Sequence, residues 1–209
     1  MKPAVFLDRD GVLNQIRWDG DTPSSPRTLD ELTIIPEAHH ATGRLREAGF
    51  LLVTITNQPD IARGALRSDD AHELNAELGR RLGIDIAYLC PHDGSDGCQC
   101  RKPRPGMVLQ AAAEWSIDLG ASWLIGDRWV DLQAAVAAGV RPILLERPYS
   151  WNPTSWGSPP DSLRASPARS TLSECVDFII EGGGSTPDKA GPLAGIDDAH
   201  RDRPSVVSE

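Results

Sequence analysis

Acidic side chains follow two short apolar runs of this sequence. Asp8 and Asp10 come directly after the first run, and Asp127 and Asp131 follow a later one. Two carboxylates so close together can take different roles in one reaction, because one can attack an electrophile while the other donates or accepts a proton. Carboxylates that converge on one place repel each other unless a hard cation lies among them, and Mg²⁺ prefers oxygen ligands and phosphate-bearing substrates. The pattern therefore predicts a magnesium site.

Two further segments carry groups suited to a phosphate. Thr56, Asn57 and Gln58 end the apolar run 51–55, and their hydroxyl, amide and backbone N–H groups can hold phosphate oxygens. Lys102 follows a third apolar run and can neutralise charge on a transferring phosphoryl group. These residues favour phosphoryl-transfer chemistry at the predicted magnesium site.

A second metal site is indicated by thiols and an imidazole. The candidate ligands lie within eleven residues of one another and are Cys90, His92, Cys98 and Cys100. Such ligands favour Zn²⁺ and suit a closed tetrahedral site. Residues 93–97 between them are polar and could not bury free thiols. Because four protein ligands leave no open position, we expect a structural zinc that fastens the loop delivering Arg101 and Lys102.

The elements that must position these groups alternate along the chain. Strands are expected at 4–7, 51–55, 86–89, 123–125 and 142–145, and helices at 37–48, 71–82, 106–115 and 132–139. This alternation predicts an α/β fold, a doubly wound parallel sheet with helices on both faces. In such sheets ligands bind beyond the carboxyl ends of the strands, which is where every candidate group lies.

The remaining segments indicate where the expected domain ends and whether another domain covers the site. Residues 14–36 are interpreted as a loop, so no large cap domain is expected over the site. Residues 176–180 are expected to form a last edge strand. Residues 182–209 are rich in Gly, Pro, Asp and Ser, which predicts a disordered tail after a single domain at 1–181.

Composition narrows the class of protein. The 209 residues carry a net charge of −9, which argues against a nucleic-acid partner. No apolar run reaches the length of a membrane span, and the N-terminal apolar stretch is too short for a signal peptide. We therefore expect a cytoplasmic protein, a monomer, with neither nucleic-acid nor membrane partners.

Four segments in this order resemble the motifs of the haloacid dehalogenase (HAD) superfamily. They are Phe6-Leu7-Asp8-Arg9-Asp10-Gly11-Val12, Thr56-Asn57-Gln58, Lys102-Pro103 and Gly126-Asp127 with Asp131. The resemblance covers about residues 4–180 and implies a Rossmann-like core. It implies that Asp8 forms an aspartyl-phosphate, that Asp10 is the acid and base, and that Thr56 and Lys102 steady the phosphoryl group. It further implies Mg²⁺ bound by Asp8, the Asp10 backbone carbonyl and Asp127, with Asp131 outside the direct ligands.

The zinc loop resembles that of two groups within this superfamily. They are the D-glycero-D-manno-heptose 1,7-bisphosphate 7-phosphatases and the histidinol-phosphate phosphatases. Residues 61–64 and 101–107 look like the heptose enzymes, whereas the short gap between His92 and Cys98 looks like the histidinol enzymes. Pro59-Asp60 departs from the Ser-Gly of the heptose group.

Charge favours the bisphosphate, because a second dianion needs arginines for bidentate pairing. The candidate substrate-binding residues are Arg9, Arg17, Asn57, Gln58, Arg63, Arg101 and Arg128. A small phosphorylated sugar is thus the expected partner, and histidinol phosphate is the alternative. A polynucleotide 3′-phosphatase would need a basic groove with stacking aromatics. A zinc-loop binding module without catalysis would not need the Asp8, Asp10 and Asp127 set.

Overall fold

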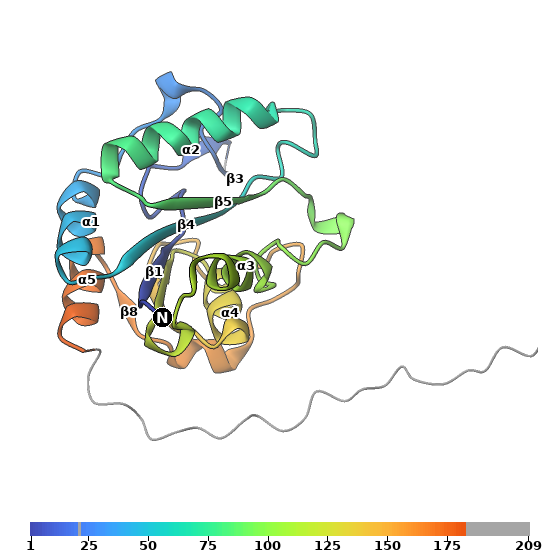
Figure 1. The fold of residues 1–209 in the computed structure, drawn as a ribbon. Helices are drawn as coiled ribbons and strands as arrows, with labels where there is room; N and C mark the ends of the chain where they lie inside the picture. The colour runs from blue at the N-terminus through green and yellow to red at the C-terminus, as the bar shows by residue number, and fades with distance from the viewer. Residues whose placement is uncertain (21, 183–209) are drawn as a thin grey trace, which may run out of the picture.

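The computed structural model describes residues 1–20 and 22–182, so the predicted tail at 183–209 lies outside the described residues. A six-stranded parallel sheet has the order β5-β4-β1-β6-β7-β8 (Figure 1). Its strands are β1 Ala4–Leu7, β4 Leu51–Asn57, β5 Ile86–Cys90, β6 Trp123–Gly126, β7 Arg141–Leu145 and β8 Ala168–Arg169. The α/β doubly wound prediction is confirmed.

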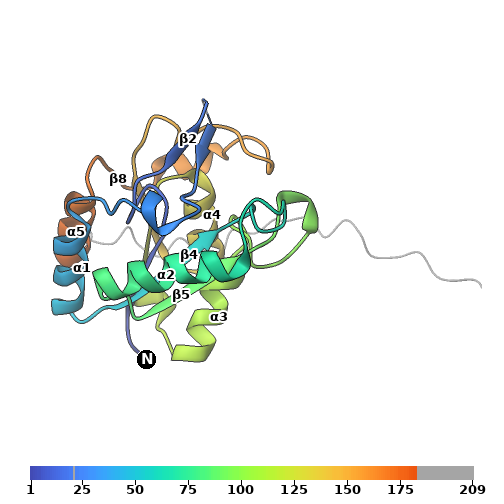
Figure 2. The same ribbon diagram turned by 90° about the horizontal axis from the view of Figure 1, so that it is seen from above.

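Five helices cover the two faces of this sheet within the described residues. They are α1 Ala38–Glu47, α2 Ser68–Leu82, α3 Gly106–Trp115, α4 Trp129–Ala138 and α5 Leu172–Ile180. Side chains of a strand alternate between faces, so Val5 and Leu7 pack with α1, α2 and α5, whereas Ala4 and Phe6 pack with α3 and α4. Figures 1 and 2 show the two helical layers on either side of the sheet. Burial on both faces explains why all four residues of β1 are apolar.

The register of the central strands brings the motifs together. β1 pairs in parallel with β4 and β6, and Leu7 lies opposite Thr54 on one side and Ile125 on the other. The Asp8 N–H continues the ladder by donating to the Ile125 carbonyl at 3.0 Å. Asp8 therefore emerges at the same edge as the residues after β4 and β6.

The prediction of an edge strand at 176–180 was wrong, because these residues belong to α5. Thr171 caps the helix by accepting a hydrogen bond from the Glu174 N–H at 3.1 Å. Its buried residues have helical spacing and are Leu172, Cys175, Val176 and Ile179. The edge position of the sheet is taken by the short strand β8 instead.

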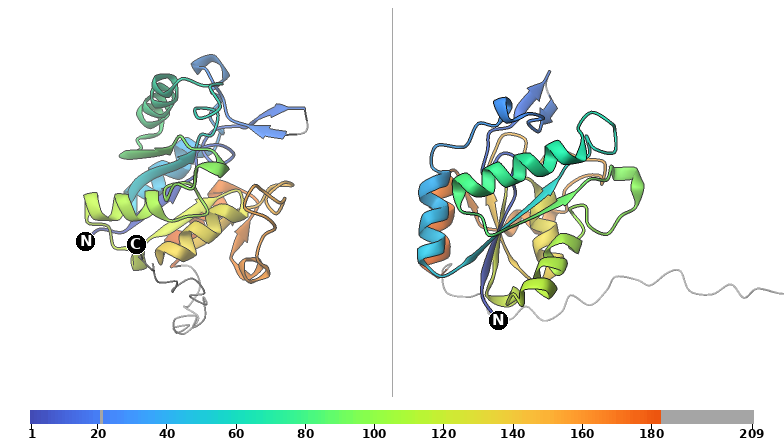
Figure 3. Two further views of the ribbon diagram at one scale, coloured as in Figure 1. Left: turned by 90° about the vertical axis from the view of Figure 1, so that its right-hand side faces the viewer. Right: turned by 45° about the horizontal axis from the view of Figure 1, so that its top comes forward.

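The segment 14–36 is more ordered than the loop that the sequence predicts. It contains the antiparallel hairpin of β2 Arg17–Asp19 and β3 Thr22–Ser24, followed by the 3₁₀ turn η1 Leu29–Glu31. The hairpin projects at the end of the molecule where the segment 147–160 also projects (Figure 3, left). Across the described ranges, no helical domain of cap size interrupts the fold, and no helix is long and apolar enough to cross a membrane.

Candidate active site

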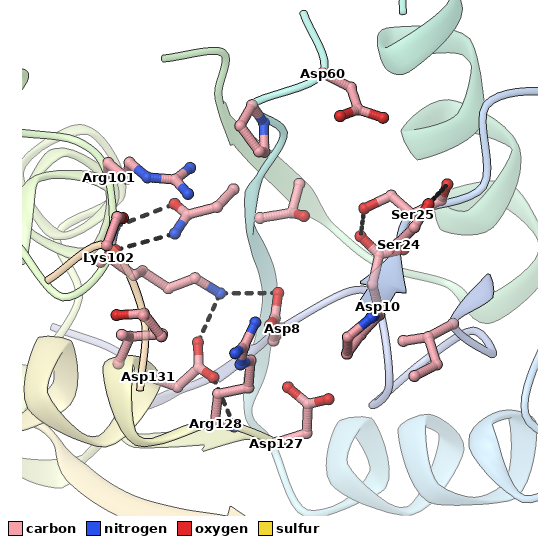
Figure 4. A pocket seen from close by; sticks show the side chains of 18 of the residues that line it. Asp8, Asp10, Ser24, Ser25, Asp60, Arg101, Lys102, Asp127, Arg128 and Asp131 are labelled. Carbon is pink, nitrogen blue, oxygen red and sulfur yellow. Dashed lines mark hydrogen bonds and ion pairs between the residues drawn. The ribbon is translucent and has the colours of Figure 1, made fainter. Parts of the chain in front are cut away.

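Lys102 lies at the centre of a buried charge cluster at the carboxyl ends of β1, β4 and β6. Its Nζ is 2.8 Å from Asp8 Oδ1 and 2.7 Å from Asp131 Oδ1. Figure 4 shows Lys102 between these two carboxylates. It also donates to the Ile55 carbonyl at 2.9 Å. The lysine side chain is only 2% exposed. This charge is therefore held in one place between two carboxylates.

The charge cluster shifts the pKa values of Asp8 and Lys102. Burial raises the pKa of Asp8 to about 7, and the repulsion from Asp131 and Asp10 adds to this against the attraction of Lys102. Burial alone would lower the pKa of Lys102, but Asp131 and Asp8 outweigh it and raise that pKa. The two carboxylates therefore favour the charged form of Lys102. Added positive charge near Asp8 would favour the ionised, attacking form of Asp8.

The acidic cluster fits a divalent cation. Carboxylate oxygens of Asp8, Asp127 and Asp131 all lie within 4.8 Å of one another. Burial, followed by repulsion from Asp8 and Asp131, raises the pKa of Asp127 well above its usual value. Among the described residues, Asp127 Oδ1 is buried without a hydrogen-bond partner. A buried oxygen without a hydrogen-bond partner inside an acidic cluster is a suitable ligand for Mg²⁺.

Asp131 differs from Asp127 because both of its oxygens are engaged. Oδ1 pairs with Lys102, and Oδ2 accepts a hydrogen bond from the Arg128 N–H at 3.0 Å at the start of α4. Asp131 therefore contacts Lys102 directly, and its place outside the direct Mg²⁺ ligands stays a prediction.

Asp10 is held as a carboxylate by its neighbours. Arg9 donates to both of its oxygens, through Nε at 3.2 Å and Nη2 at 3.1 Å, and Asn14 and Ser25 each donate at 2.9 Å. Burial alone would raise the pKa of Asp10, but the Arg9 charge and these hydrogen bonds outweigh it and lower that pKa. Figure 4 shows Asp10 near Ser25, on the far side of Asp8 from Lys102.

The segment after β4 orders other residues of the site. The Asn57 amide contacts the Lys102 backbone twice, since Nδ2 donates to the carbonyl and Oδ1 accepts from the N–H, both at 3.1 Å. Gln58 is fully buried and donates to Asp10 and to the Thr56 hydroxyl, each at 2.8 Å. Asn57 and Gln58 therefore position Lys102 and Asp10.

The predicted zinc ligands come together. The ligand atoms of Cys90, His92, Cys98 and Cys100 lie within 4.8 Å of one another. Cys90 Sγ is 3.7 Å from Cys98 Sγ and 3.2 Å from Cys100 Sγ, and His92 Nδ1 is 3.3 Å from the latter sulfur. Zn–S bonds of about 2.3 Å in a tetrahedron place sulfurs roughly 3.8 Å apart. The cluster therefore has the ligand types and size for a zinc ion.

A cavity of about 480 Å³ opens over this charge cluster. Residues expected in the site that line it are Asp8, Asp10, Thr56, Asn57, Arg63, Arg101, Lys102, Asp127, Arg128 and Asp131. The hairpin contributes Pro23 and Ser24, and the segment after β7 contributes Tyr149 and Trp156. Segments from distant parts of the chain therefore shape one pocket.

The expected arginines fall into two groups. Arg101 and Arg128 line the cavity, and in the described part of the chain neither forms an ion pair and the Nε of each is buried without a partner. Arg101 instead donates from Nη1 to the His92 carbonyl at 3.1 Å, which ties it to the zinc loop. Arg63 pairs with Asp93 at 2.7 Å. Only Arg101 and Arg128 among these three are thus without a carboxylate partner.

Two expected substrate-binding arginines occupy other places. Arg9 is fully buried and contacts Asp10 and Asn75, with Nη1 donating to the Asn75 amide oxygen at 3.0 Å. Its side chain orders Asp10 and does not line the cavity. Arg17 lies outside the cavity and pairs with Glu31 at 3.2 Å. These positions do not suit direct substrate contact.

Sequence reasoning missed several residues of the cavity. Arg27 pairs with Asp60 at 2.8 Å, which joins the chain after the hairpin to the loop after β4. The Tyr149 hydroxyl donates to Asp127 Oδ2 at 2.6 Å. Burial and the negative Asp127 raise the pKa of Tyr149, so its phenol keeps the donated proton. Neither contact belongs to a local motif, so spacing along the chain did not indicate it.

Fold, charge cluster and pocket define a HAD-superfamily phosphatase, and similarity to known proteins agrees. A family model described as HAD-hydrolase-like matches residues 99–147. The heptose-bisphosphate phosphatase of Bordetella bronchiseptica, solved with magnesium and phosphate, superposes with a TM-score of 0.71 at 30% identity. That superposition covers 86% of this chain and 98% of the other.

Sequence similarity identifies the family within that class. The D-glycero-β-D-manno-heptose-1,7-bisphosphate 7-phosphatase of Pseudomonas aeruginosa is 42% identical over 69% of this chain and 82% of its own length. Its namesake in Escherichia coli K12 is 35% identical over 74% of this chain and 87% of its own length. The chain belongs to the heptose-bisphosphate 7-phosphatase family.

Proposed function

We propose that this chain hydrolyses the 7-phosphate of a heptose 1,7-bisphosphate through an aspartyl-phosphate on Asp8. The observation that carries the proposal is the placement of Asp8, which faces the cavity with Lys102 at 2.8 Å and an acidic cluster beside it. The names of its relatives support the substrate.

In the first step an Asp8 oxygen attacks phosphorus while the bond from phosphorus to the sugar oxygen breaks. Lys102 balances the charge on the phosphoryl oxygens, and Thr56 lines the same pocket as a hydroxyl donor. Asp8, Asp127 and the Asp10 backbone carbonyl would hold Mg²⁺. Bound there, Mg²⁺ would neutralise charge on the phosphoryl group and help to align it.

Asp10 is proposed to carry the protons of both steps. It gives one to the departing sugar oxygen and takes one from the water that cleaves the aspartyl-phosphate. Its lowered pKa suits the second role, because an ionised carboxylate is ready to accept a proton. The first role requires Asp10 to be protonated, so the substrate must weaken the hold of Arg9 and Ser25 on this carboxylate.

The second phosphate is proposed to bind at Arg101 and Arg128. Both line the cavity, and neither has an ion-pair partner in the described ranges. Charge-assisted pairing with a guanidinium is among the stronger polar contacts in proteins. Arg27 and Arg63 are already neutralised in part by Asp60 and Asp93. The distal anion should therefore prefer Arg101 and Arg128, which have no carboxylate partner in the described ranges.

The Cys–His cluster is proposed to hold a structural Zn²⁺. All four candidate ligands belong to the protein, which leaves no open position for chemistry. The ion would fix the loop from β5 to Lys102, and through Arg101 it would shape the pocket.

We further propose that residues 1–181 form the catalytic domain of a cytoplasmic monomer. Light scattering would measure the mass of the particle in solution and so test the monomer.

The function is tested by phosphate release from three compounds in the presence of Mg²⁺. They are heptose 1,7-bisphosphate, histidinol phosphate and a 3′-phosphorylated oligonucleotide. The proposal requires the bisphosphate to have the highest kcat/KM and requires the activity of the zinc-loaded protein to depend on added Mg²⁺. A preference for histidinol phosphate would replace the substrate and leave the phosphatase chemistry in place.

A further inference from the structure

The turn after β7 contacts Asp127 at two points. Ser150 Oγ donates to the Asp127 backbone carbonyl at 2.6 Å, and the Tyr149 hydroxyl donates to its Oδ2 at 2.6 Å. The Trp129 N–H in turn donates to the Ser150 carbonyl at 3.0 Å, which ties this turn to the start of α4. The turn therefore holds both the backbone and the carboxylate of Asp127.

These contacts are buried and tightly packed. Tyr149 is 6% exposed, and Ser150 and Asp127 are at most 1% exposed. Gly11 lies against the pair, with a φ of +88°, and a Cβ there would clash with Asp127 Oδ2 and lie 2.8 Å from the Tyr149 hydroxyl. Only glycine allows the loop after β1 to approach so closely. Little room is left for the tyrosine or the carboxylate to turn.

The hydrogen bond from Tyr149 gives the two Asp127 carboxylate oxygens different roles. Oδ2 is occupied by the phenol, whereas Oδ1 is buried and has no partner within the described residues. A carboxylate anchored at one oxygen cannot rotate freely about its terminal bond. The anchored arrangement thus leaves Oδ1 as the oxygen available to a cation.

The hairpin stabilises the tyrosine from the other side. The Trp18 ring on β2 packs edge-on against the Tyr149 ring, with centroids 5.9 Å apart and planes inclined by 74°. This is a favourable aromatic geometry. The same tyrosine therefore connects the hairpin at the pocket mouth with a carboxylate of the acidic cluster.

We propose that Tyr149 is a positioning residue for the magnesium site, which it serves by orienting the Asp127 carboxylate. The proposal rests on the proposed function, since it assigns Mg²⁺ to Asp127. Groups that hydrogen-bond a metal ligand from outside the coordination shell typically contribute about 10- to 100-fold to metal affinity or activity. Loss of the phenol hydroxyl should weaken Mg²⁺ binding more than it weakens catalysis by the fully loaded enzyme.

The test measures Mg²⁺ affinity directly by isothermal titration calorimetry of the zinc-loaded protein. Tyr149→Phe keeps the ring that packs on Trp18 but removes the donated hydrogen bond. Tyr88→Phe is the matched control, because Tyr88 is the other tyrosine of the chain and its hydroxyl contacts Glu114, away from the cavity. We expect the Mg²⁺ dissociation constant to rise about tenfold or more in Tyr149→Phe and to stay at the native value in the control.

Two further readouts separate positioning from a general structural role. The rise of the unfolding temperature caused by Mg²⁺ should shrink in Tyr149→Phe, each protein being compared with its own metal-free form. At saturating Mg²⁺ the variant should recover most of the native kcat. Native Mg²⁺ affinity in Tyr149→Phe would overturn the proposal and leave the phosphatase function standing. Absence of Mg²⁺ binding by the native protein would overturn both.

Discussion

Lys102 Nζ lies 2.8 Å from Asp8 Oδ1, and this pair joins two motifs that are 94 residues apart in the chain. Asp8 leaves the end of β1, whereas Lys102 is delivered by the loop that carries the Cys–His cluster. Asn57 fixes the Lys102 backbone through two hydrogen bonds. The nucleophile and its cation are thus brought together by three separate loops of the parallel sheet.

Asp8→Asn is expected to abolish phosphatase activity without unfolding the protein. An amide is a very poor nucleophile, so the aspartyl-phosphate cannot form. The unfolding temperature should not fall, because the substitution also removes a carboxylate whose pKa is raised by burial. Asp69→Asn, at an exposed position of α2, is the matched control. Activity above a hundredth of native, a loss of roughly 3 kcal/mol or less, would remove Asp8 from the nucleophile role.

Cys98→Ser is expected to lower both zinc content and stability. Protein purified without added metal should contain one zinc per chain by elemental analysis, and the variant should contain less. Zinc binding to such sites contributes directly to folding. Cys175→Ser tests a buried thiol far from the cluster and should leave the zinc content unchanged. Native zinc content and stability in Cys98→Ser would contradict a structural zinc site.

Arg101→Ala should lower kcat/KM strongly for the bisphosphate but weakly for p-nitrophenyl phosphate. The arginine is expected to bind the distal phosphate, and a hydrogen bond to a charged group contributes about 1.5–3 kcal/mol. This corresponds to a loss of roughly ten- to a hundredfold on the bisphosphate alone. Arg80→Ala is the surface control, on the exposed face of α2. Equal losses on both substrates would assign Arg101 to the transferring phosphate or to the loop.

Sequence reasoning predicted the chemistry because Asp8 and Asp127 directly follow strands and Lys102 lies on the loop after a further strand. Asp8, Lys102 and Asp127 could be placed at one edge, since the carboxyl ends of parallel strands coincide. The error at 176–180 arose because a short apolar run does not distinguish strand from helix. The capping residues Thr171 and Glu174 were the overlooked signal. The strands of the hairpin, β2 and β3, are equally short, and tertiary contacts such as the packing of Trp18 on Tyr149 and the Arg17–Glu31 ion pair hold it in position.

Contacts between loops that are distant in the chain could not be predicted from the sequence. The side chain of Arg9 looked available to substrate, yet the fold buries it against Asp10 and Asn75. Tyr149 lies 22 residues after Asp127 in no recognisable motif, and their hydrogen bond depends on how the turn after β7 folds back. Such pairings depend on tertiary packing and not on local spacing.

The central claim is that this protein removes the 7-phosphate of a heptose 1,7-bisphosphate, and ³¹P NMR of the reaction tests it most directly. With native protein and Mg²⁺, the resonance of the 7-phosphate should disappear as inorganic phosphate appears, while the 1-phosphate resonance persists. The Asp8→Asn protein, measured in parallel, should leave both resonances unchanged. Loss of the 1-phosphate first, or an unchanged spectrum with the native protein, would contradict the account.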